Sequence, residues 1–145
     1  MNNDLTILPS VKISSTALDA EARRMEVIAN NVANANTTKG PDGRIFRRKE
    51  VVFAEKLAEA IDGSGKHNQP GGVEIKGIVE DTRPAKQVYR PGHPDADANG
   101  YMSMPDINVV EEMVDMMSST RAYEANLAAI RAAKGMAEKA LGIGK

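Results

Sequence analysis

The sequence predicts a mainly α-helical protein in which long amino- and carboxy-terminal helices pair like a coiled coil around a small β-rich insert. Two observations predict the helices: apolar residues recur at about seven-residue spacing near both ends, and breaker-rich segments bound each stripe. A third concerns the middle of the chain, where short alternating runs are separated by glycine and proline. We therefore divide the chain into 1–38, 39–105 and 106–145, the first and last parts forming one discontinuous domain.

The first helix is expected over residues 11–35, because its apolar positions follow the heptad spacing of a helix that packs on a partner. Ser14, Ser15 or Thr16 offers a cap for its start, and the segment 36–43 contains the residues that end a helix. The candidate interface residues on this seam are Val11, Leu18, Met25, Ile28 and Val32.

Four asparagines crowd the end of this helix, although asparagine is a poor residue for a helix interior. Helical spacing places Asn30 and Asn34 on one face. They either cap a frayed helix end and face water, or form amide hydrogen bonds that fix the register of a helix pair or a subunit contact. We include Asn30 and Asn34 among the candidate interface residues and leave both interpretations open.

The middle of the chain is expected to form short β elements over residues 44–53, 71–80 and 86–89. Two polar connections rich in glycine, proline and asparagine, 61–72 and 90–105, read as loops.

The second helix is expected over 109–141, beginning after a cap from Asp106 or Asn108 and ending at Gly142. Glu111 and Glu112 suit its positive amino-terminal end. At about 1.5 Å per residue the helix is about 50 Å long, which exceeds the diameter of about 40 Å expected for a compact chain of this size. Steps of four and three give the candidate interface residues Val109, Met113, Met116, Tyr123, Leu127, Ile130 and Leu141.

Composition favours assembly over a rigid globule. The chain has only 2 Phe and 3 Tyr and no Trp, so large core anchors are scarce, whereas 8 Met suit surfaces that repack against partners. A net charge of −1 gives no global field for nucleic acid or anionic lipid. The absence of cysteine excludes disulfides and thiol chemistry. We see neither a leader pattern nor an apolar run of about 18 residues, so we expect no cleaved signal and no membrane insertion.

A dense basic run, Arg44, Arg47, Arg48 and Lys49, is more typical of a solvated strand or a rim of inter-subunit ion pairs than of a nucleic-acid patch. Strand alternation places Arg47 and Lys49 on one side and Arg48 on the other. The charges therefore do not form one continuous face.

The spacing of Asp95, Asp97, Asn99 and Gly100 resembles a calcium-binding loop, with Asp106 at its last ligand position. Prolines before the loop and the short last ligand weigh against calcium, and we favour a turn rich in Asx residues that leads into the second helix. The two histidines, His67 and His93, lie in separate loops without a recognisable nucleophile or metal motif. We therefore assign no catalytic, cofactor or metal site and expect no enzyme.

One family matches several segments of the chain. The segment 29–37, ANNVANANT, resembles the amino-terminal signature of bacterial flagellar rod and hook axial proteins. The segments 89–101, 108–116 and 119–126 are similar to the proximal-rod subunits of that family. The resemblance spans nearly the whole chain and is weakest in the loop 61–70.

This resemblance implies a structural subunit that polymerises through its terminal helices to form the drive shaft and export channel needed for motility. The implied partners are other copies of the chain, other rod subunits, the adapter at the base of the rod and, during secretion, the flagellar type III export apparatus. It also implies a location in the periplasmic rod, export without a cleaved signal peptide, and no nucleic-acid partner.

Overall fold

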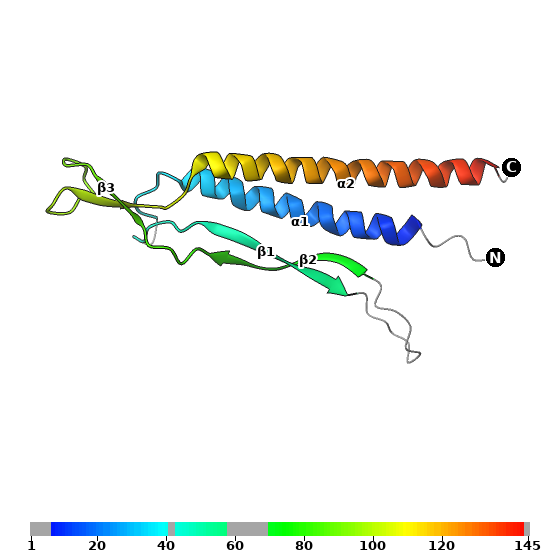
Figure 1. The fold of residues 1–145 in the computed structure, drawn as a ribbon, viewed down its shortest axis with the longest axis horizontal. Coiled ribbons are helices and arrows are strands. Elements are labelled where there is room, and N and C mark those ends of the chain that lie inside the picture. Colours follow the sequence, from blue (N-terminus) through cyan, green and yellow to red (C-terminus); the bar gives the residue numbers. More distant parts are fainter. Residues whose placement is uncertain (1–6, 41–42, 58–69, 144–145) are drawn as a thin grey trace.

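Two long antiparallel helices run along the molecule (Figure 1). The structure is a computed structural model that describes residues 7–40, 43–57 and 70–143. Helix α1 (Ile7–Asn34) and helix α2 (Val109–Ile143) lie side by side, so the start of α1 and the end of α2 are at the same end of the pair. The predicted pairing of the terminal helices is confirmed.

The β insert forms two small antiparallel sheets between these helices in sequence. Strand β1 (Lys49–Leu57) pairs with β2 (Pro70–Glu80), and this ribbon packs on α1 on the side away from α2. Strand β3 (Lys86–Tyr89) pairs with β4 (Tyr101–Met104) near the end where α1 stops and α2 begins (Figure 1). Helix α1 is therefore the central layer between α2 and the ribbon, and the predicted mainly α fold with a β insert is confirmed.

Both helices are longer than the sequence predicted. Helix α1 starts at Ile7, ahead of the serines and Thr16 that were expected to cap it. Thr16 Oγ1 instead donates to Ile13 O at 2.8 Å and accepts from Val73 N at 3.1 Å, so it ties the helix to β2. At the second helix, Asn108 is the cap as predicted, since its Oδ1 accepts from Val110 N at 3.1 Å. Helix α2 passes through glycine 142 to residue 143, because one glycine weakens a helix without ending it.

The strands differ from prediction mainly in β1 and β4. Strand β1 runs from Lys49 to Leu57 and not from residue 44 to 53. Strand β4 lies within the segment 90–105 that was predicted to be a loop, because Gly100, with φ of 82°, turns the chain back so that Tyr101 pairs with Tyr89. Of the predicted glycine-rich loop, 61–69 lies outside the described residues and 70–72 belongs to β2.

The interior between the helices is built from small and polar side chains. The largest fully buried side chains of the described residues are Glu112, Asn31 and Ser119. The buried apolar residues are Ala20, Val27, Ile28, Ala35, Val51, Met102 and Ala133. Because alanine and serine bury little apolar surface, this helix pair gains less from the hydrophobic effect than a seam of leucines would.

One glycine of β2 is required by close contact with α1. Gly72 has a φ of 114°, and a Cβ at this position would overlap the Oγ1 atom of Thr16. We expect Gly72→Ala to lower the free energy of unfolding by about 2 kcal/mol or more, because it combines backbone strain with a steric clash. Urea unfolding measures the loss. Gly77→Ala in the same strand is the control, since a Cβ there meets nothing within 4 Å; equal losses in the two variants would contradict the steric explanation.

Candidate subunit interface

The candidate residues of α1 lie on or beside the face that packs within the molecule. Ile28 is buried at 4% exposure, and the remaining four apolar candidates are half-buried: Val11, Leu18, Met25 and Val32. The single chain thus covers much of this seam itself. Their role in contacts between subunits stays a prediction.

The candidate residues of α2 divide between two faces. Four are half-buried beside the α1 contact: Met116, Tyr123, Leu127 and Ile130. Val109, Met113 and Leu141 are exposed, Leu141 at 77%. The most buried positions of α2 are instead Glu112, Ser119 and Ala133, which share the seven-residue spacing of a packed helix face. The first candidates in this series, Val109 and Met113, therefore lie outside the contact with α1. The later candidates from Met116 to Ile130 lie beside it.

An exposed apolar surface lies on the other side of α2. Val110, Met113, Val114 and Met117 have the spacing i, i+3, i+4, i+7, which places them on one helix face. They are 69%, 57%, 56% and 53% exposed, respectively. We call these four residues the outer patch. Helix-in-groove and helix-on-helix contacts use this spacing of apolar anchors, so the outer patch has the form of a protein-binding surface.

Sequence reasoning identified only Met113 of the outer patch. The first turns of α2 carry apolar residues on both sides, with Val109, Val110, Met113 and Val114 close in sequence. Periodicity alone cannot tell which side faces α1. Glu112 could not have distinguished them either, because glutamate is rarely buried and its partner Arg48 is identified only by the fold.

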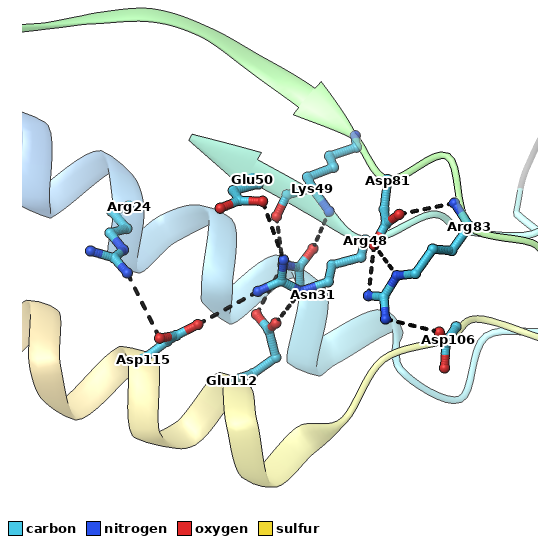
Figure 2. A network of polar contacts seen from close by, with 10 residues as sticks. All are labelled: Arg24, Asn31, Arg48, Lys49, Glu50, Asp81, Arg83, Asp106, Glu112 and Asp115. Atoms are coloured by element: carbon cyan, nitrogen blue, oxygen red, sulfur yellow. Dashed lines mark hydrogen bonds and ion pairs between the residues drawn. The ribbon is translucent and has the colours of Figure 1, made fainter. Parts of the chain in front are cut away.

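A buried polar cluster joins α1, α2 and β1 (Figure 2). Asn31 is fully buried, and its Nδ2 donates to Glu112 Oε2 at 2.9 Å and to Lys49 O at 2.8 Å. Its Oδ1 accepts from Lys49 N at 2.9 Å, so the side-chain amide pairs with the first peptide group of β1. The other oxygen of Glu112 accepts from Arg48 Nε at 2.6 Å. Both oxygens of the buried carboxylate are thereby hydrogen-bonded, as a charge in this position requires.

Arg48 balances the charge of Glu112. Its side chain is 22% exposed, while that of Glu112 is 1% exposed, and weaker ion pairs link Arg48 to Asp115 at 3.5 Å and Glu50 at 3.5 Å. Burial lowers the pKa of Arg48, but the hydrogen bond and charge of Glu112 outweigh it and raise the pKa above its usual range. Arg24 of α1 adds an ion pair to Asp115 at 3.7 Å (Figure 2). Arg48 of the basic run thus has its partners within the chain.

The asparagine that joins secondary-structure elements is Asn31, which sequence reasoning did not select. Asn30 is exposed, and Asn34 Nδ2 donates to Asn30 O at 2.8 Å, a local bond within the last turn of α1. A contact of Asn30 or Asn34 with another subunit stays a prediction. Asn31 could have been found from its spacing, because it lies four residues before buried Ala35 and three after buried Ile28.

The carboxylates of the calcium-like segment do not converge. Asp95 pairs with Lys39 at 2.7 Å, and hydrogen bonds from Lys39 and a threonine hydroxyl hold the pKa of Asp95 below its usual range. Asp97 accepts hydrogen bonds from backbone amides later in the same turn, and Asp106 pairs with Arg83 at 3.2 Å. Across the part of the chain that the structure describes, three or more metal-ligating side chains are nowhere gathered in one place. The segment is a turn closed by its own Asx residues.

Neither helix could lie across a bilayer: in the described ranges no helical stretch of sufficient length is apolar enough.

Comparison with known proteins gives matches at both ends and over the whole length. Residues 12–41 match the family described as flagella basal body rod protein, and residues 98–143 match the family described as flagellar basal body rod FlgEFG protein C-terminal. The two matched regions contain most of α1 and all of α2. The resemblance stated from the sequence is therefore confirmed.

Several relatives align with nearly the full chain. The flagellar basal-body rod protein FlgC of Salmonella typhimurium is 41% identical over 141 residues, which cover 97% of this chain and 100% of the relative. FlgC of Bacillus subtilis is 41% identical over 152 residues with the same coverage, and FlgC of Borreliella burgdorferi is 39% identical over 94% of this chain. The family is structural and not enzymatic, and its members are components of the flagellar rod, which assembles from rod subunits. By this identity and coverage, the chain belongs to the FlgC family of flagellar basal-body rod proteins.

Proposed function

We propose that this chain is a subunit of the proximal part of the rod and polymerises through its terminal helices with other copies of itself and with other rod subunits. The outer patch carries this proposal, since four apolar side chains on one face of α2 are more than half exposed in the single chain. Contiguous apolar surface of this kind is covered by a partner when a protein assembles. In the rod, the assembled helices form the drive shaft and line the export channel required for motility.

The two helices act in this proposal as one discontinuous axial domain, 1–38 with 106–145, and the insert 39–105 lies beside it. The pairing of α1 with α2 supports this division. The family resemblance supports a position in the periplasmic rod, export by the flagellar type III apparatus without cleavage, and contact with the adapter at the rod base. It gives no role to nucleic acid or to insertion in a membrane.

The test is deletion of the gene in its own bacterium, followed by electron microscopy of isolated basal bodies. We expect cells without flagella and basal bodies without any rod, because a missing proximal subunit leaves nothing for later subunits to bind. Expression of the full chain from a plasmid should restore the rod. A rod stub of reduced length in the deletion strain would instead place this subunit further along the rod, and a rod of normal length would contradict the proposal.

A further inference from the structure

We propose that Asn31, Arg48 and Glu112 form a register lock, a polar cluster that fixes how far α2 slides along α1. The three side chains come from α1, the segment entering β1, and α2, and Glu112 accepts hydrogen bonds from both Asn31 and Arg48 (Figure 2). The lock is a property of the single chain and does not depend on the assembly proposed above.

Packing along the most buried line of α2 specifies the register weakly. The buried positions of α2 after Glu112 are short, Ser119 and Ala133, with the half-buried Asn126 at the heptad position between them. A slide of one heptad, about 10 Å at 1.5 Å per residue, exchanges each of these for the next. Short side chains at equivalent positions fill similar space, so along this line the slide changes the packing little; Met116, Tyr123 and Ile130 beside it are also seven residues apart but differ more in size.

The polar cluster favours the observed register over the register shifted by one heptad. In the slipped register Ser119 would lie opposite Asn31, and a hydroxyl supplies no charge to Arg48. Both Arg48 and the Asn31 amide would lose the carboxylate that accepts from them in the structure. A single buried polar side chain sets register in coiled coils for the same reason, since wrong alignments leave polar groups without partners.

The neighbouring ion pairs contribute less to this choice. Asp115 pairs with Arg24 at 3.7 Å and with Arg48 at 3.5 Å, and the Asp115 side chain is 38% exposed. Exposed ion pairs of this kind contribute at most about 1 kcal/mol to the stability of a protein. The buried carboxylate of Glu112 is therefore the group whose position along α2 decides the register. The register in turn decides where the outer patch lies relative to α1 and the ribbon.

The absence of cysteine in the chain permits a direct test by thiol crosslinking. Met25 and Thr120 touch across the helix pair, with Thr120 Oγ1 3.5 Å from Met25 Sδ, so the pair M25C with T120C reports the observed register. The pair M25C with L127C reports a slide of one heptad. A bifunctional thiol reagent shorter than about 10 Å distinguishes the two registers. In the purified full chain we expect crosslinking of 25 to 120 and little of 25 to 127.

Moving the carboxylate by one heptad should move the helix. In the exchange variant Glu112→Ser with Ser119→Glu, we expect the ratio of the two crosslinked products to reverse, with 25 to 127 now dominant. A carboxylate that merely stabilised the fold would not produce a new crosslink. Continued dominance of 25 to 120 in the exchange variant would overturn the proposal.

A second variant covers the case in which the exchange variant does not fold. The triple change Asn31→Leu, Arg48→Met and Glu112→Leu removes the polar groups but retains bulk. We expect it to keep its helical circular dichroism and to give both crosslinks. If it gives only 25 to 120, packing alone sets the register and the proposal is wrong. Loss of helical signal in both variants would also overturn it, because the cluster would then be needed for folding as a whole.

Discussion

Arg48→Ala is expected to lower the free energy of unfolding of the monomer by about 3 kcal/mol, because it leaves the carboxylate of Glu112 buried without a counter-charge. This value lies at the low end for such a loss, since Arg48 is 22% exposed and Asn31 still donates to Glu112. Against a total stability of about 5 to 15 kcal/mol, the change is large. Urea unfolding followed by circular dichroism measures it.

The matched control is Arg47→Ala, which removes a neighbouring arginine whose side chain is exposed and makes only a 3.4 Å hydrogen bond to Asp81 O. We expect that change to cost less than about 0.5 kcal/mol. The double variant Arg48→Met with Glu112→Leu should recover most of the loss, because replacing both members of a buried pair removes the uncompensated charge. Equal effects of Arg47→Ala and Arg48→Ala would contradict the assigned role of Arg48.

Met117→Asp is expected to abolish rod assembly while leaving the monomer folded, provided the outer patch is buried between subunits as proposed. Met117 is 53% exposed in the single chain, so its replacement should change monomer stability by no more than about 0.5 kcal/mol. In an interface the same carboxylate would be buried without a partner, at a cost of several kcal/mol. Complementation of a deletion strain, scored by swimming and by rods in isolated basal bodies, measures assembly, and thermal unfolding measures the fold.

The matched control for the outer patch is Met136→Asp on the same helix. Met136 is 59% exposed, similar to Met117, but lies outside the four-residue patch. We expect this variant to restore more motility than Met117→Asp. Normal swimming of the Met117→Asp strain would show that the patch is not a contact, and equal failure of the two variants would show a general intolerance of charge on α2.

The sequence indicated the helices and most strands because those signals are local. Heptad spacing and breaker residues predicted α1 and α2 to within a few residues at each end, apart from the start of α1, and alternation predicted β2 and β3. Strand β4 was missed because its four residues follow a glycine-rich turn and have little pattern of their own. They are a strand because the connection 90–100, which ends at Gly100, brings them alongside β3.

The faces of the helices were harder to assign than their positions. Apolar residues occur on more than one side of the first turns of α2. Their spacing alone did not show whether the side with Val109 or the side with Glu112 faces α1. The antiparallel pairing with α1 places Glu112 inside and leaves Val110, Met113, Val114 and Met117 outside. A buried glutamate is too rare to be predicted without its partner, and Arg48, 64 residues away in sequence, is identified as that partner only by the fold.

By itself, then, the sequence determined the two helices, the β character of the insert, the lack of large core anchors and the family, because each of these depends on residues close together or on whole segments read in order. Only the tertiary structure decided which asparagine is buried, which arginine pairs with Glu112 and which side of α2 is exposed to solvent. These choices depend on distances between segments that lie far apart in the chain. Burial makes these contacts important, because a buried polar group without a hydrogen-bond partner is costly, and here the partner lies far away in the sequence.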